Sequence, residues 1–168
     1  MKKFFRSVFT LSLVFITLVP TAFLVNANTP EWQDVALTDE EIASILALNP
    51  NNPAESPDTR ASDLIHFYSI GISKDGNTLY IVGKTTGTTQ VVKSGFKEVV
   101  IQRRVNSSSS WTDYVTYEDI YWDEFACVLS KSLTVLSGYQ YRVTCVHYAK
   151  KNIFSVQKID NVSNILTF

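Results

Sequence analysis

The chain has 168 residues, a formal net charge of −1, a hydrophobic fraction of 45% and two cysteines. These values fit one globular domain with short appendages, and they exclude a collagen, a disulfide-dense miniprotein and a multi-domain enzyme. Composition alone names no activity.

The first 27 residues have the three parts of a secretory signal peptide. The start is cationic through Lys2, Lys3 and Arg6, and an apolar run over residues 8–19 follows. Small residues then occupy the positions that signal peptidase reads in Val25-Asn26-Ala27. An uncleaved membrane anchor is the alternative, but a spanning helix needs ~20 mainly apolar residues and this run is shorter. We expect cleavage after Ala27 and a secreted, extracellular product.

The charge of the remaining chain is unevenly distributed. Residues 28–63 carry eight acidic residues and one basic residue, whereas residues 64–168 carry eleven basic and eight acidic residues. An acidic arm therefore precedes a mildly basic domain. The arm could be a solvated, disordered leader, which composition favours, or it could fold back on the domain through salt-sensitive contacts.

The acidic arm, residues 28–62, contains one predicted helix. Thr38 and Glu41 have the spacing of a capping box, and Ile42, Ile45 and Leu46 follow at helical intervals. This pattern predicts a short helix over about residues 39–48, which would be marginal alone and needs a partner surface. Residues 49–57 form a Pro/Asn linker that ends it.

From residue 63 onward the hydrophobic period changes to two. A turn at residues 74–77 separates the alternating run of residues 68–72 from a return strand at 78–82, which predicts a hairpin. Residues 83–89 are expected to form a Gly/Thr loop. Further strands are expected over residues 91–92, 96–105, 111–117, 128–136, 139–148 and 153–158. About seven short strands predict an all-β antiparallel sandwich over residues 63–168.

The segment around residues 136–148 carries two resemblances. Leu136, Gly138, Tyr141 and Val143 resemble the corner and following strand of fibronectin type III domains, within the immunoglobulin-like sandwiches, where a tyrosine hydroxyl fixes the corner. Alternation there predicts one buried face made by Tyr139, Tyr141, Val143, Cys145 and His147.

The same region also resembles short secreted proteins of Gram-positive bacteria that have no assigned function. These share a late Gly…Tyr-Arg-Val…His-Tyr pattern, found here in Gly138, Tyr141, Arg142, Val143, His147 and Tyr148. The resemblance implies an uncharacterised secreted family and transfers no catalytic residue.

The two cysteines, Cys127 and Cys145, could form a disulfide, because export permits one. Two buried thiols acting as small apolar residues are the equal alternative. The spacing is not that of a zinc site, and we expect neither a metal nor a cofactor.

The sequence contains no complete catalytic set. His66 and His147 are the only histidines, and each alternates with apolar residues, which is typical of packing or rim positions. No Gly-x-Ser-x-Gly turn is present. Basic residues such as Arg103-Arg104 and Lys150-Lys151 make only small spots, which argues against nucleic-acid binding. We therefore expect a protein that is not an enzyme.

Residues 111–125 are rich in aromatic and acidic side chains. The candidate binding surface within this stretch comprises Trp111, Tyr114, Tyr117, Tyr121 and Trp122, interleaved with the carboxylates of Asp113, Glu118, Asp119, Asp123 and Glu124. Such aromatics could bind sugar rings or a cationic partner, and paired carboxylates could hydrolyse a glycoside. The alternative is that the aromatic residues belong to the core of the sandwich.

These observations favour a secreted, non-enzymatic β-sandwich that acts as an interaction module at the bacterial cell envelope. The main alternative is a carbohydrate-binding or carbohydrate-processing domain that uses residues 111–125. The expected partner is a protein or a cell-wall glycan, with no nucleic acid, and with membrane contact only through an uncleaved signal peptide.

Overall fold

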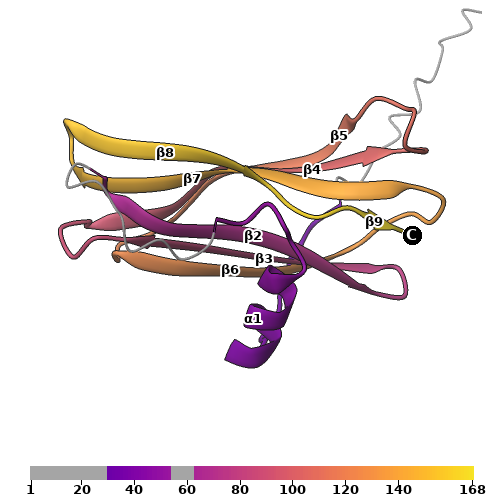
Figure 1. Cartoon of the computed structure of the whole chain (residues 1–168), viewed down its shortest axis with the longest axis horizontal. Helices are drawn as coiled ribbons and strands as arrows, with labels where there is room; N and C mark the ends of the chain where they lie inside the picture. Colours follow the sequence, from indigo (N-terminus) through magenta and orange to yellow (C-terminus); the bar gives the residue numbers. More distant parts are fainter. Residues whose placement is uncertain (1–29, 54–62) are drawn as a thin grey trace, which may run out of the picture.

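A computed structural model describes residues 30–53 and 63–168 of the chain. The predicted signal peptide and its cleavage site lie outside these residues. Two antiparallel sheets face each other as layers, and one helix lies outside them (Figure 1). The elements are β1 (Gln33–Asp34), α1 (Asp39–Ala47), β2 (Ile65–Asp75), β3 (Thr78–Gly87), β4 (Lys93–Arg104), β5 (Thr112–Trp122), β6 (Ala126–Thr134), β7 (Gln140–Asn152), β8 (Ser155–Val162) and β9 (Leu166–Thr167).

The strand order confirms the predicted antiparallel sandwich. The first sheet has the order β1-β6-β3-β2, and the second has the order β5-β4-β7-β8 with β9 paired to β7. Strands β2, β3 and β6 thus stand where immunoglobulin-like folds have strands A, B and E, and β5, β4, β7 and β8 stand where those folds have C′, C, F and G. The fold class predicted from strand spacing is therefore correct.

Strand β7 forms the centre of the core, because its side chains alternate strictly between buried and partly exposed. Tyr141, Val143, Cys145 and His147 are buried, as predicted, and Tyr139 at the open end is partly buried. The hydroxyl of Tyr141 donates to the carbonyl oxygen of Leu136 at 3.1 Å and accepts from its N–H at 3.2 Å. This is the tyrosine corner that the resemblance to fibronectin type III domains implied.

Several strand boundaries differ from the prediction. In the last hairpin, β7 continues to Asn152, residues 153–154 form the turn instead of beginning a strand, and β8 runs from Ser155 to Val162. The hairpin turn is correct, with Asp75 opposite Thr78, but β3 continues through the expected Gly/Thr loop to Gly87. Strand β5 likewise continues through the acidic residues to Trp122, and no strand forms at residues 91–92. In both extended strands, the backbone N–H and C=O groups form hydrogen bonds with the neighbouring strands. These bonds keep the segments extended although their local composition is typical of a loop.

The acidic arm forms the predicted helix. Thr38 Oγ1 accepts from the N–H of Glu41 at 3.3 Å, and Glu41 Oε2 accepts from the N–H of Thr38 at 2.8 Å, which completes the capping box. The helix packs its buried Ile45 over Gly71 of β2 so closely that a Cβ on this glycine would lie 2.5 Å from the carbonyl oxygen of Ile45. Helix α1 thus covers the side of the first sheet that faces away from the second (Figure 1).

The expectation of a solvated leader is wrong for residues 30–53, which fold back on the sandwich. Trp32 stacks flat on Tyr117 of β5, with ring centroids 3.6 Å apart, and β1 pairs with β6. At the other edge, Asn49 Nδ2 donates to the carbonyl oxygens of Ile70 at 2.7 Å and Val162 at 2.9 Å. The arm therefore spans the first sheet from one edge to the other and ties its β2 edge to β8.

Candidate functional site

Two arginines and a tryptophan meet on the outer face of the second sheet, near the β4–β5 hairpin. Alternation along β4 and β7 turns Gln102, Arg104, Gln140 and Arg142 away from the buried core. The strand register places Arg104 opposite Gln140 and Gln102 opposite Arg142. We call the set Arg104, Arg142, Trp111, Gln102 and Gln140 the Arg–Trp surface.

Both guanidinium groups of the Arg–Trp surface lie against the same indole. The Cζ atom of Arg104 is 4.3 Å from the centroid of the Trp111 ring, and that of Arg142 is 4.4 Å from it. The attraction between a cation and the electron-rich ring face, with the planar stacking that arginine permits, holds the two side chains in place.

The two glutamines orient the guanidinium groups further. Arg104 Nε donates to Gln140 Oε1 and Arg142 Nε donates to Gln102 Oε1, each at 2.8 Å. Among the described residues, the terminal nitrogens of Arg104 have only one long contact, at 3.3 Å to the carbonyl oxygen of Ser107, and those of Arg142 have no hydrogen bond. Donor groups of both arginines therefore stay free for a ligand.

No carboxylate neutralises the two arginines within residues 30–53 and 63–168, where every ion pair involves a lysine. Burial, and secondly the charge of Arg104, lower the pKa of the Arg142 guanidinium, although arginine remains protonated at any physiological pH. Two adjacent, partly desolvated positive charges with free forked donors are the arrangement that binds carboxylate or phosphate oxygens best.

A third arginine extends this end of the sandwich. Arg103 alternates with Arg104 and points to the other face, where its Cζ lies 4.5 Å from the ring centroid of Tyr114 and 4.8 Å from that of Tyr139. Tyr114 in turn packs edge-on against Tyr141. Arg103 thus covers the open end of the core and adds positive charge near the Arg–Trp surface.

The five aromatic residues of the candidate binding surface do not share one face. Trp111 belongs to the Arg–Trp surface, whereas Tyr114, Tyr117 and Trp122 pack against the core. Tyr117 stacks on Trp32 and donates its hydroxyl to the carbonyl oxygen of Pro30 at 2.8 Å. Tyr121 lies against Tyr148 at the opposite end of β5, with its hydroxyl donating to Asp119. The core alternative therefore holds for three of the five.

The carboxylates between these aromatics are exposed and serve as surface partners. Asp113 accepts from Gln102 Nε2 at 2.8 Å, Asp119 pairs with Lys97, and Asp123 pairs with Lys93. Asp119 has a φ of 56°, which breaks the alternation of β5. Such exposed pairs contribute little to stability and do not form an acid–base pair around a common substrate position.

The two cysteines are free and buried, so the disulfide alternative is wrong and the buried-thiol alternative is correct. They lie on different sheets, Cys127 on β6 and Cys145 on β7. Cys127 is opposite Thr85 within the first sheet, whereas Cys145 Sγ lies 3.3 Å from His147 Nε2. Burial raises the pKa of both thiols, which keeps them protonated.

His147 links the two sheets through a buried chain of hydrogen bonds. Its Nδ1 lies 2.7 Å from Thr85 Oγ1, and that hydroxyl donates to the carbonyl oxygen of Gly95 at 3.2 Å. Both ring nitrogens thus have a hydrogen-bonding neighbour, Thr85 Oγ1 at Nδ1 and the Cys145 thiol at Nε2. The histidine is neutral, fully buried and structural, and burial lowers its pKa to about 3. His66 is exposed on β2.

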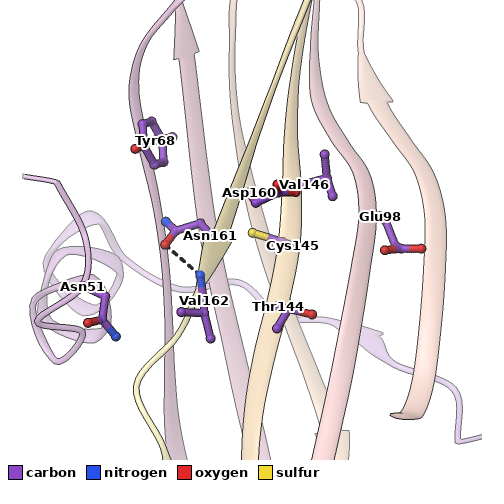
Figure 2. Close-up of a pocket in the computed structure, with 9 residues that line it drawn as sticks. All are labelled: Asn51, Tyr68, Glu98, Thr144, Cys145, Val146, Asp160, Asn161 and Val162. Atoms are coloured by element: carbon purple, nitrogen blue, oxygen red, sulfur yellow. Dashed lines mark hydrogen bonds between the residues drawn. The ribbon is translucent and has the colours of Figure 1, made fainter.

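A hollow of about 550 Å³ opens where β2 of the first sheet approaches β7 and β8 of the second. Figure 2 shows its lining, which is Asn51, Tyr68, Glu98, Thr144, Cys145, Val146, Asp160, Asn161 and Val162. The single hydrogen bond among these residues joins the N–H of Val162 to the side chain of Asn161, at 2.8 Å. The Cys145 thiol lies 3.3 Å from His147 Nε2, and burial lowers the pKa of that imidazole to about 3, so it is a weak base.

Within the described residues, no three histidine, cysteine or acidic side chains gather as metal ligands would. In the same part of the chain, α1 is far too short to cross a bilayer, and no helix there meets the length and hydropathy that crossing requires.

Sequence reasoning missed the Arg–Trp surface. In the sequence, Arg103-Arg104 makes only a small basic spot, and Arg142 stands out only as part of the Tyr-Arg-Val pattern. Gln140 and Arg142 alternate with buried residues and share the polar face of β7, but the partners of that face depend on which strand lies beside β7.

No protein-family model matches the chain, and no curated protein sequence matches it. Among solved structures, the chain is similar to the GAE domain of GGA2p from Saccharomyces cerevisiae. The identity is 10%, the match covers 69% of this chain and 97% of that domain, and the TM-score is 0.25. At this score the likeness carries no conclusion about function.

Proposed function

We propose that the chain is a secreted, non-enzymatic β-sandwich interaction module of the bacterial cell envelope, and that it binds an anionic envelope polymer on the Arg–Trp surface. The observation that carries this proposal is the pair Arg104 and Arg142, stacked on one indole with their Nε atoms held by glutamines and with free terminal donors.

Export is supported by the sequence of the first 27 residues, with its cationic start, apolar run and Val25-Asn26-Ala27 cleavage motif. The placement at the envelope of a Gram-positive bacterium is supported by the resemblance carried by residues 138–148. A non-enzymatic role is supported by the state of the buried nucleophiles, since the Cys127 and Cys145 thiols are both protonated.

The chemistry of the partner follows from the donors. Each guanidinium presents parallel N–H groups that match two oxygens of one carboxylate or phosphate. Because the two arginines are neighbours on adjacent strands, one anionic group could contact both, or two consecutive groups of a polymer could each contact one. Both side chains are already held by stacking and hydrogen bonds, so they lose little conformational freedom when a ligand binds, and this favours affinity.

Fluorescence titration of the chain with polyphosphate and with polyglutamate tests this proposal, since the indole of Trp111 lies beside the expected ligand. We expect binding that weakens as salt rises and that is lost in the double variant Arg104→Gln/Arg142→Gln. The matched control is Lys150→Gln/Lys151→Gln, which removes the same charge from the opposite end of the sandwich. Equal loss in both double variants, or binding unchanged in the arginine variant, would contradict the proposal.

A further inference from the structure

The hairpin turn between β7 and β8 exposes two large apolar side chains. Ile153 is 75% exposed and Phe154 is 92% exposed, and they are the two residues between the paired Asn152 and Ser155. In Figure 1 this tip lies where β7 and β8 meet, at the end of the sandwich away from β9. Val92, which is 57% exposed, donates its N–H to the carbonyl oxygen of Lys150 and so lies beside the hairpin.

Neither turn chemistry nor packing explains these residues. Two-residue hairpin turns favour Asn, Asp or Gly, because these residues adopt turn conformations without strain and are well hydrated. The turn is formed instead by Asn152, whose side chain accepts from the N–H of Phe154 at 2.9 Å. An isolated exposed apolar residue is ordinary, but a phenylalanine and an isoleucine side by side on a protruding turn indicate a contact surface.

The charges around the tip identify the partner. The hairpin segment of residues 148–158 holds three lysines and no acidic residue. Lys150 and Lys151 directly precede the turn, and Lys93 lies opposite Lys150 on β4. Asp123 pairs with Lys93 and offsets its charge, whereas Lys150 and Lys151 form no ion pair with any carboxylate among the described residues.

We propose that this β7–β8 tip inserts into the interface of an anionic lipid bilayer. A convex turn cannot bury its side chains against a flat protein surface, whereas the headgroup region accepts protruding apolar side chains from above. Lysines beside the tip meet the anionic headgroups at the same depth. The Arg–Trp surface lies at the opposite end of β7, so a protein docked by the tip holds that surface away from the membrane.

Co-sedimentation with vesicles tests the proposal directly. The chain of residues 28–168 is suitable, because every contact described above lies within residues 30–168, and because it lacks the apolar leader that would itself bind lipid. We expect binding to vesicles of phosphatidylglycerol and phosphatidylcholine that falls at least about tenfold in Ile153→Ser/Phe154→Ser. In Lys150→Gln/Lys151→Gln we expect a fall of ~25-fold, from about fivefold per lysine.

Two control variants distinguish the loss of the apolar tip from other causes of weaker vesicle binding. Leu136→Ser removes an apolar side chain that is 54% exposed at the far end, and this variant should bind like the unchanged chain. Ile153→Asn/Phe154→Gly introduces residues that hairpin turns favour, so a loss of binding in this variant cannot come from a damaged turn.

The proposal is overturned if the unchanged chain does not sediment with anionic vesicles, or if the serine double variant sediments equally well. It is also overturned if Arg104→Gln/Arg142→Gln abolishes sedimentation while the tip variants do not, a result that would assign the lipid contact to the Arg–Trp surface. A tip-dependent dimer seen by size exclusion, without vesicle binding, would equally exclude the membrane as partner.

Discussion

The buried His147 should make the protein lose stability in mild acid. In the folded state its pKa is about 3, because the imidazole is fully buried and both ring nitrogens are used in a neutral hydrogen-bond chain. In the unfolded chain the same group has a pKa of about 6.5. As pH falls below 6.5 the unfolded state binds a proton that the folded state does not, so the free energy of unfolding decreases.

The size of this loss follows from the difference between the two pKa values. For each unit by which pH falls below the pKa of His147 in the unfolded state, the free energy of unfolding decreases by about 1.4 kcal/mol. This continues until pH reaches the pKa of the folded state. Between about pH 7.5 and 4.5 the contribution of His147 is therefore a loss of about 3 kcal/mol, a large fraction of the stability of a small domain.

Urea unfolding at a series of pH values, followed by circular dichroism, measures this loss. The comparison is with His147→Gln, which cannot titrate, while the carboxylates common to both proteins contribute equally and cancel. His66→Gln, which removes the exposed histidine, is the control for loss of a histidine elsewhere in the fold. Parallel pH profiles for the unchanged chain and His147→Gln would refute the reasoning, as would an NMR titration showing that His147 ionises near pH 6.

Three substitutions test other contacts of the fold, each by urea unfolding. Gly71→Ala should cost about 1–3 kcal/mol, because the new Cβ would meet the backbone of Ile45 and push α1 off the sheet; an unchanged midpoint would show that the helix is not docked there. Tyr141→Phe should cost about 1–2 kcal/mol, because both hydrogen bonds to Leu136 are lost, and a neutral result would exclude a stabilising corner. Asn49→Ala should lower the free energy of unfolding by ~2 kcal/mol and speed amide exchange along β2, because its hydrogen bonds to Ile70 and Val162 are lost. Unchanged exchange would mean that the arm does not protect that edge.

The architecture was predictable because its signals are local. The period-two pattern, the turn at residues 74–77 and the tyrosine at the start of β7 each act within one or two strands, and together they specify a sandwich. The capping box of α1 was equally local and equally correct. By contrast, the docking of the arm depends on Gly71, a residue whose role appears only when the helix is placed against it.

The Arg–Trp surface was not predictable, because it depends on contacts between strands and not on local sequence. Arg104, Trp111 and Arg142 come together through the registers of β4 with β5 and with β7, and the second of these joins residues far apart in the sequence. A shift of one residue in the β4–β7 ladder would put the two arginines on opposite faces of the sheet. The aromatic stretch was misleading because a strand distributes its residues over two faces, so neighbours in sequence need not be neighbours on a surface.

Isothermal titration with polyphosphate at low salt measures whether Arg104 and Arg142 hold the anion, by comparing the affinities of two charge-matched double variants. We expect Arg104→Gln/Arg142→Gln to weaken binding at least about tenfold, from the loss of charge-assisted hydrogen bonds, and Lys150→Gln/Lys151→Gln to bind nearly as tightly as the unchanged chain. Equal affinities for the unchanged chain and the arginine variant would contradict this expectation.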